Sequence, residues 1–305
     1  MKAGTNLEKI LESGNFTVTA EAGPPKGTGA EVVQRKGELL RHCCDAINVT
    51  DNQTAIVRLS SLAGCLLLKQ QGADPVIQIV VRDRNRLAIQ SDVLGAVALG
   101  IGNILCLSGD HQKFGNHPTA RGVFDIDSIQ LIQTLKNMRD EKKFLSGDDI
   151  SGEVPLFIGA AANPFADHFE YRVSRLAKKV KAGADFIQTQ AVYDVAKFTK
   201  WMEMVTDRGL DKQVHILAGV IPIRSAGMAR YMRDYVSGVS VPDEIVTRME
   251  DAENAREEGV RIVLEIIEQL KEVPGVHGIH IMAVGWEDIV PEIIERAGLL
   301  PRPVL

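Results

Sequence analysis

Ile104-Leu105-Cys106-Leu107-Ser108-Gly109-Asp110-His111 is an apolar run that stops abruptly at a carboxylate, near the end of the first third of the chain. The sequence then turns polar and rich in glycine and proline over 112–122. A buried strand that delivers a carboxylate at its C-terminal end is a common way to build an active site on an α/β fold. The stretch therefore predicts a strand over 103–107 and a functional Asp110 just beyond it.

The same alternation extends along the whole chain. Short apolar or β-branched runs are separated by stretches with helical periodicity, and Gly, Pro, Asn and Asp mark the boundaries. The run 75–81 is almost continuously apolar, which is typical of a strand covered on both faces. We predict strands over 17–21, 46–50, 75–81, 103–107, 156–162, 185–189, 215–221 and 278–284. We predict helices over 30–42, 55–71, 84–99, 127–139, 168–182, 195–207 and 287–297.

Eight strand–helix units in succession predict a closed (β/α)8 barrel of the TIM type, a single domain over 1–305. Strands separated by helices pair in parallel with right-handed crossovers. An open doubly wound sheet would show a similar local pattern. However, no GxGxxG opens a helix, and Gly100-Ile101-Gly102 precedes a strand, which indicates a helix stop. An extra helical segment, about 225–273, is expected between the last two strands, with Pro242 and Pro274 bounding its second part.

Composition excludes several classes of function. The 305 residues are 45% apolar and 25% charged, which are ordinary globular values. A net charge of −5 offers no basic face for nucleic acid. No run approaches the roughly 20 apolar residues that span a bilayer, and no signal-like segment opens the sequence. The four cysteines lack the CxxC spacing of a metal site and indicate no disulfide framework. We therefore expect a cytoplasmic protein that binds neither nucleic acid, membrane nor metal.

Polar side chains collect where the predicted strands end, and loops at that face of a barrel form the active site. These residues are Glu21, Thr50, Asp51, Arg82, Asp83, Asp110, Asn163 and Gln190. Asp127 and Asp194 have a structural explanation, because each precedes a helix and fits an N-cap. Glu21 has none, because Gly23-Pro24-Pro25 follows it and the next helix starts several residues later. For Asp110 a plain Gly-Asp turn is an equal alternative.

Two carboxylates on the inner rim of a barrel suit proton transfer coupled to a cation. Desolvation on an apolar rim raises the pKa of a carboxylate, which favours a general acid. A second carboxylate that stays ionised stabilises a cationic intermediate. Glu21 and Asp110 are the candidates for this pair, and by themselves they do not identify the substrate.

Several segments together resemble the methylenetetrahydrofolate reductase family. They are Thr19-Ala20-Glu21-Ala22-Gly23-Pro24-Pro25-Lys26, Asn48-Val49-Thr50, Leu107-Ser108-Gly109-Asp110 and the run KVKAGADFIQTQ at 179–190. The likeness covers most of the chain and is weakest after about Ser225. It implies a TIM-like barrel that holds a flavin, usually FAD with FMN as the alternative, at the C-terminal ends of its strands. It also implies flavin-dependent reduction of 5,10-methylenetetrahydrofolate to 5-methyltetrahydrofolate, a step of one-carbon metabolism that serves methionine biosynthesis.

The resemblance assigns roles position by position. Glu21 matches the general acid that helps open the five-membered ring to an iminium cation, and Asp110 matches the aspartate beside flavin and pterin. Gln190 matches the glutamine that hydrogen-bonds the folate, so these three residues are expected to bind substrate. Positions that look like flavin contacts are Thr50, Gly109, Asp110, Asp127, Asn163, His168 and Lys179. Among them Lys179 suits a phosphate, while Asp127 equally suits an N-cap and His168 a helix cap or a packing role.

The chain also departs from the family pattern. Gln78 stands where better-known bacterial enzymes have a histidine, and Ser108 replaces a common arginine. The stretch 222–226 lacks a phenylalanine that helps seat nicotinamide or folate, and 283–286 lacks an Asn-Arg pair. These departures concern the electron donor most. We expect either NADH or an electron-donating partner subunit, and an oligomer.

Two other functions remain open at the level of sequence. One is a folate-binding barrel of the methyltransferase type, which has no redox role and needs no flavin. The other is a flavin subunit of a larger electron-transfer complex, which would carry flavin but show no folate turnover alone. The absorbance spectrum of the purified protein separates the first from a flavin enzyme, and folate turnover separates the second.

Overall fold

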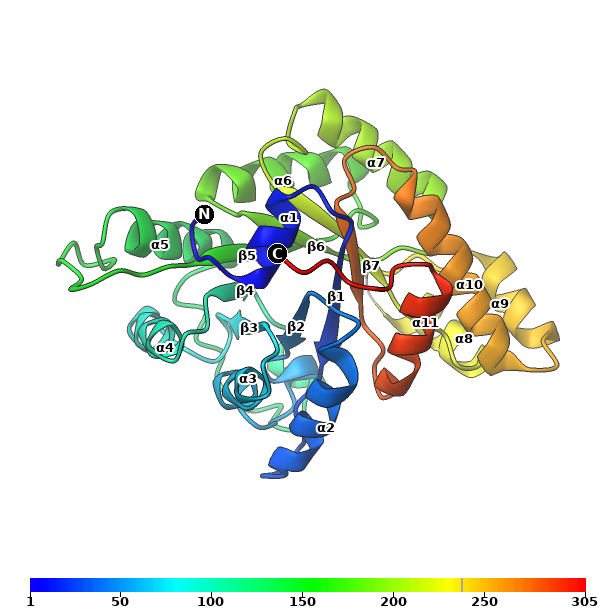
Figure 1. Ribbon diagram of the computed structural model, residues 1–305, viewed down its shortest axis with the longest axis horizontal. Coiled ribbons are helices and arrows are strands. Elements are labelled where there is room, and N and C mark those ends of the chain that lie inside the picture. The colour runs from blue at the N-terminus through cyan, green and yellow to red at the C-terminus, as the bar shows by residue number, and fades with distance from the viewer. Residues whose placement is uncertain (237) are drawn as a thin grey trace.

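Eight parallel strands close into a barrel in chain order, as the computed structural model of residues 1–236 and 238–305 shows (Figure 1). The last strand pairs with the first, and Thr19 lies opposite His280 in that register. This pairing confirms the barrel and excludes the open doubly wound sheet. The strands are β1 (Thr17–Ala22), β2 (Ala46–Val49), β3 (Pro75–Val80), β4 (Asn103–Leu107), β5 (Phe157–Ala162), β6 (Phe186–Ala191), β7 (His215–Val220) and β8 (Gly278–Ile281).

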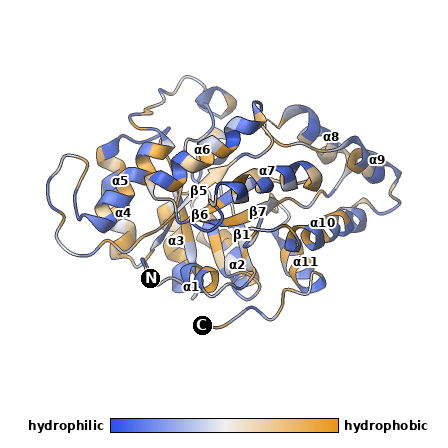
Figure 2. Ribbon diagram, turned by 90° about the horizontal axis from the view of Figure 1, so that it is seen from above, coloured by the Kyte–Doolittle hydropathy of each residue, from blue (hydrophilic) through white to orange (hydrophobic). Residues whose placement is uncertain are grey.

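Helices surround the barrel, with their apolar faces toward the strands and their polar faces outward (Figure 2). The surrounding helices are α2 (Ala30–Leu40), α3 (Ser61–Gln70), α4 (Arg86–Ala98), α5 (Ser128–Asp140), α6 (Phe169–Ala182), α7 (Val195–Asp207), α10 (Ala255–Lys271) and α11 (Val290–Arg296). Two more helices, α8 (Ala226–Tyr235) and α9 (Asp243–Asp251), lie outside this ring in the connection from β7 to β8 (Figure 1).

A helix that the sequence analysis did not predict, α1 (Asn6–Glu12), closes the N-terminal end of the barrel. Leu7 and Leu11 pack with inward residues of the strands, including Phe157 and Phe186, whose rings stack 5.2 Å apart. Gly159 makes this packing possible, because a Cβ there would lie 2.2 Å from the Phe186 ring. The lower half of the barrel is therefore a solid core, and any ligand must enter from the opposite end.

Several predicted boundaries need correction. The helix expected over 55–71 begins at Ser61, because the Ser60 hydroxyl accepts a hydrogen bond from the backbone of Ala63 and so caps it. The preceding residues 53–55 form a 3-10 turn in which Thr54 and Ala55 both have a φ of 56°. The region 241–273 contains two helices rather than one, since Asn254 caps α10. A 3-10 turn (Glu287–Ile289) precedes α11 in the last predicted helix.

Among the residues that the structure describes, no helix is both long and apolar enough to cross a membrane. The expected extra helical segment contains α8, α9 and α10, and residue 237 within it lies outside the described residues.

Candidate active site

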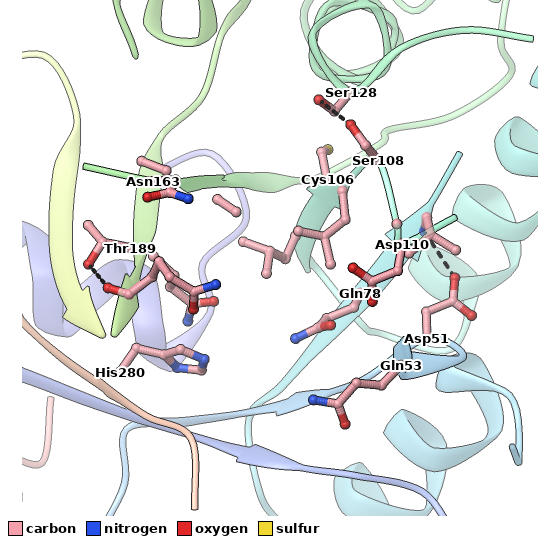
Figure 3. Close-up of a pocket in the computed structure, with 18 of the residues that line it drawn as sticks. Asp51, Gln53, Gln78, Cys106, Ser108, Asp110, Ser128, Asn163, Thr189 and His280 are labelled. Carbon is pink, nitrogen blue, oxygen red and sulfur yellow. Dashed lines mark hydrogen bonds between the residues drawn. The ribbon is translucent and has the colours of Figure 1, made fainter. Parts of the chain in front are cut away.

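A cavity of about 500 Å³ opens where the strands end, above the packed lower core. Its walls come from residues on almost every side of the barrel, as Figure 3 shows for His280, Gln78, Asp110 and Asn163. The size lies within the range of small-molecule and cofactor sites. The predicted residues that line it are Glu21, Gly109, Asp110, Asn163, Lys179 and Gln190.

Glu21 faces this cavity from β1, and its side chain is 12% exposed. Gln53 donates from Nε2 to Glu21 Oε1 at 3.1 Å, and Gln78 donates from Nε2 to Oε2 at 3.3 Å. Burial raises the pKa of Glu21 to about 6, although both amides oppose the rise because they stabilise the charged carboxylate. Among charged neighbours, Glu287 favours the protonated form and Lys36 the ionised form. Glu21 thus exchanges a proton near neutral pH, as a general acid must.

A buried histidine stands beside Glu21, at the level of the same strands. His280 Nε2 lies 4.0 Å from Glu21 Oε2, and its Nδ1 lies 2.9 Å from the hydroxyl of Thr19. Burial lowers the pKa of His280 to about 3, so the ring is neutral. Gln188 donates to the Thr19 oxygen at 3.1 Å, and the Thr19 hydroxyl lies within 3.4 Å of the Ile279 carbonyl, so His280 belongs to a buried polar network beside Glu21.

Asp110 lies on the opposite side of the cavity, in the turn that follows β4 (Figure 3). Gly109 adopts a φ of +82°, which L side chains rarely take, and so turns the chain sharply before the aspartate. Ser108 bonds through its hydroxyl to that of Ser128 at 3.3 Å, which ties the turn to the start of α5. The Asp110 side chain is exposed to the cavity and to solvent. One desolvated and one solvated carboxylate therefore face the same space.

A basic wall completes the cavity on the side of α6. Arg172, Arg175 and Lys179 all line it, and their spacing places them along one face of the helix. Lys179 is 8% exposed, and its ammonium donates to the backbone carbonyl of Ala161. Burial lowers the pKa of Lys179 to about 8, with Arg175 adding to the effect. An anionic group bound here would offset both the cost of desolvating the Lys179 ammonium and its repulsion by Arg175.

Three predicted cofactor contacts lie elsewhere. Asp127 is exposed and caps α5, because its carboxylate accepts from the backbone of Ile129 and Gln130. His168 is exposed at the N-cap position of α6. Thr50 is buried, and its hydroxyl has no hydrogen-bond partner among the residues that the structure describes.

The cavity also holds four side chains that the sequence did not predict as site residues, His280, Gln53, Arg172 and Arg175. A signal for His280 existed, since it is a polar residue between two isoleucines in a short strand and must therefore point to the opposite face. Gln53 gave no such signal, because it lies in an irregular turn whose path depends on the rest of the fold. Arg172 and Arg175 are spaced to lie on one face of a helix, but arginines on a solvent-exposed helix face have the same spacing, so the pattern does not indicate a site.

Comparison with known proteins identifies relatives of the chain. A family model described as methylenetetrahydrofolate reductase matches residues 6–298. Methylenetetrahydrofolate reductase 1 of Schizosaccharomyces pombe is 32% identical over 211 residues, which are 66% of this chain and 32% of that protein. Methylenetetrahydrofolate reductase 2 of the same yeast is 26% identical and covers 99% of this chain, which spans 48% of the relative. The chain thus spans less than half of the length of each of these two relatives.

Solved structures share the barrel at low sequence identity. One is a Clostridium thermocellum protein that binds two copies of 5-methyl-5,6,7,8-tetrahydrofolic acid, with a TM-score of 0.63 and 14% identity over 96% of this chain and 97% of that one. Another is a riboflavin lyase with a modified FMN, with a TM-score of 0.56 and 9% identity over 93% and 92% of the two chains. At these identities the likeness concerns the fold.

Proposed function

The chain belongs to the methylenetetrahydrofolate reductase family, and on that premise we propose that it reduces 5,10-methylenetetrahydrofolate to 5-methyltetrahydrofolate with a bound flavin. The observation that carries this proposal is the environment of Glu21. Its carboxyl group is desolvated, has a pKa of about 6 and faces a cavity shared with Asp110. Ring opening of the folate needs a proton donor and creates a cation, and these two carboxylates supply both needs.

In this proposal each polar group has a defined task. Glu21 gives its proton to the folate nitrogen that leaves the methylene carbon, and the amides of Gln53 and Gln78 keep the carboxyl oriented. Asp110, which stays in contact with solvent, stabilises the iminium cation through its negative charge. Gln190 lines the cavity and has amide groups suited to the pterin ring.

The residues of the cavity also suit a flavin. When bound, a flavin would supply the hydride that converts the iminium carbon into a methyl group. Lys179, with the arginines of the same helix face, would hold a phosphate, since a buried cation gains most from an anionic partner. Thr50 remains a candidate contact, although its buried, unpartnered hydroxyl does not line the cavity. We propose FAD as the flavin, with Asn163 and Gly109 as contacts in the cavity and Asp127 and His168 as candidate contacts outside its lining.

Electron supply, location and assembly belong to the proposal as well. We propose that NADH or a partner subunit reduces the flavin, and that the protein forms an oligomer. A cytoplasmic location agrees with four cysteines that are all free, buried thiols.

The test begins with the purified protein. Its bound cofactor is released and identified by mass, and the flavin is then reduced without oxygen and mixed with 5,10-methylenetetrahydrofolate. The proposal predicts stoichiometric FAD and its reoxidation with formation of 5-methyltetrahydrofolate. Protein without flavin would support the methyltransferase-type barrel instead. Flavin that folate never reoxidises would support an electron-transfer subunit. Rapid bleaching of the flavin by NADH alone would remove the need for a partner donor.

A further inference from the structure

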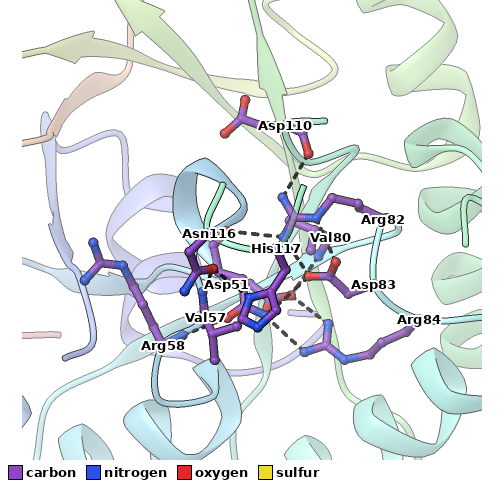
Figure 4. Close-up of polar contacts among 11 residues, drawn as sticks. Asp51, Val57, Arg58, Val80, Arg82, Asp83, Arg84, Asp110, Asn116 and His117 are labelled. Atoms are coloured by element: carbon purple, nitrogen blue, oxygen red, sulfur yellow. Dashed lines mark hydrogen bonds and ion pairs between the residues drawn. The ribbon is translucent and has the colours of Figure 1, made fainter. Parts of the chain in front are cut away.

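Arg82 is a buried arginine at the end of β3, and its guanidinium joins three separate parts of the chain (Figure 4). Its side chain is 2% exposed. It forms a fork with the neighbouring carboxylate, from Nε to Asp83 Oδ1 at 2.7 Å and from Nη2 to Oδ2 at 2.6 Å. Nη1 donates to the backbone carbonyl of Asp110 at 3.0 Å, and Nη2 donates to that of Asn52 at 3.2 Å. Only the planar, five-donor group of arginine makes such a set of contacts.

On one side, these contacts hold the turn that carries Asp110. Gly109 packs so closely on Arg82 that a Cβ at the glycine would lie 3.3 Å from Nη1 and 3.1 Å from the Cβ of Val80. The turn therefore packs directly on the guanidinium, and the hydrogen bond from Arg82 to the Asp110 carbonyl fixes the position of the turn relative to β3. The direction of the Asp110 carboxylate depends on that backbone.

On the other side, the same pair holds the turn that reaches Glu21. Asn52 has a left-handed φ of 44°, and its side chain donates to Asp83 Oδ2 at 3.3 Å while its carbonyl accepts from Arg82. The next residue is Gln53, whose amide donates to Glu21 Oε1 at 3.1 Å. A change at Arg82 would thus reach Glu21 through one backbone step and one hydrogen bond.

The neighbouring ion pair does a different job. Arg84 binds both oxygens of Asp51, at 2.6 and 3.1 Å, and Asp51 also accepts from the backbone of Val80. That pair fastens β3 to the loop that follows β2. Among the residues that the structure describes, Arg82 is the side chain that donates hydrogen bonds both to the turn that carries Asp110 and to the turn whose Gln53 contacts Glu21.

We propose that Arg82 and Asp83 are positioning residues that fix the distance and orientation between Glu21 and Asp110. The inference rests on the proposed function for its chemical meaning, since it is the folate half-reaction that needs both carboxylates at once. We call Arg82 and Asp83, with their bonds to the two turns, the clamp. Whether the clamp holds both turns does not depend on which ligand the cavity binds.

The first measurement needs no flavin or folate. Hydrogen exchange is followed in peptides covering 51–54 and 108–111 in the wild-type chain and in Arg82→Lys, which keeps the charge but loses the fork. Exchange in both segments is expected to accelerate together, on the order of tenfold, because both lose the same support. The matched control is Arg86→Lys, which weakens a half-exposed pair with Asp125 that touches neither turn, and it is expected to exchange like the wild type.

The second measurement uses the flavin-loaded protein and separates two half-reactions. Reoxidation by 5,10-methylenetetrahydrofolate in Arg82→Lys is expected to slow on the order of 10- to 100-fold, because catalysis is sensitive to misplacement of about 1 Å. Reduction of the flavin in the same variant is expected to slow less than the folate half-reaction, because protonation by Glu21 takes part in the folate half-reaction alone. Asp83→Asn is a milder second variant for use if the lysine variant does not fold. It is expected to slow the folate half-reaction in the same way but by a smaller factor.

The outcomes distinguish the two levels of inference. Unchanged exchange in Arg82→Lys and Asp83→Asn, or acceleration in one segment only, would overturn the clamp. The clamp would also be overturned if the wild type reduced folate and both variants reduced it equally fast. A wild-type protein that never reduces folate would instead overturn the proposed function, and the exchange measurement would still decide whether the clamp exists.

Discussion

Glu21 is held between opposing influences: burial raises its pKa to about 6, and the amides of Gln53 and Gln78 pull it down. A general acid works while it is protonated. The folate half-reaction should therefore be fastest below pH 6 and should fall about tenfold per pH unit well above it. Stopped-flow rates of flavin reoxidation between pH 5 and 9 measure this profile. A rate that is flat across pH 6, or that rises with pH, would contradict the role of Glu21.

Gln78 provides a way to move that profile. Its amide hydrogen bond stabilises the ionised form of Glu21, so Gln78→Leu should raise the pKa of the carboxyl group further. The midpoint of the pH profile should then move above 6, with a higher rate at pH 7. A control is Gln269→Leu on the exposed face of α10, which should leave the midpoint where it is. A shift to lower pH in Gln78→Leu would mean that the amide plays another role.

At the scale of single elements, Gly159 on β5 is a position where packing leaves no room for a side chain. A Cβ there would lie 2.2 Å from the ring of Phe186, so Gly159→Ala should lower the free energy of unfolding by about 1–3 kcal/mol. Gly95 in α4 is a matched control, because its Cβ would meet open space. Gly95→Ala should raise the free energy of unfolding by about 0.5–1 kcal/mol. Urea denaturation of both variants measures the contrast, and equal effects would contradict the packing described.

Most helices and strands can be predicted from the sequence, and the exceptions have physical reasons. All eight strands were predicted within one to three residues at each end, because β-branched runs and helical periods alternate cleanly along the chain. The start of α3 was not, since the preceding turn depends on positive φ angles at Thr54 and Ala55, which such residues rarely adopt. Short α1 was missed because it is stabilised by packing into the barrel, and packing is not visible in a seven-residue stretch.

The candidate site shows the same division. Polar residues at strand ends were recognisable, because topology alone brings them to one rim. Their neighbours were not, since the hydrogen bond from Gln53 to Glu21 depends on an irregular turn, and the approach of His280 to Glu21 joins strands far apart in sequence. Arg82 was visible as a strand-end residue, but its three partners appear only when two turns meet over it.

For the whole molecule, one buried and two half-buried histidines make stability sensitive to acid. Burial lowers the pKa of His215 to about 4, that of His280 to about 3, and also that of His277, all from an ordinary 6.5. As the pH falls below 6.5, the unfolded chain takes up protons that the folded protein does not, so stability falls. Glu21 and Asp74 oppose this, because burial raises the pKa of each carboxyl group and lets the folded state bind its proton more tightly than the unfolded chain does.

Urea denaturation at pH 7 and pH 5 tests this balance. The free energy of unfolding should be lower at pH 5 than at pH 7. His215→Asn should reduce the difference, because one of the three histidines with a lowered pKa no longer titrates in the unfolded chain. A protein that is equally stable at both values, or more stable at pH 5, would contradict the burial of these rings.

The central claim is that this barrel reduces a folate with Glu21 as the proton donor, and one pair of single-turnover experiments addresses it. Wild-type protein and Glu21→Gln are loaded with the same flavin, reduced without oxygen and mixed with 5,10-methylenetetrahydrofolate. Both should accept electrons at similar rates. The wild type should then yield one 5-methyltetrahydrofolate per flavin, whereas the variant should be slower on the order of 10²–10⁴-fold. Equal rates of product formation in the two proteins would contradict the account.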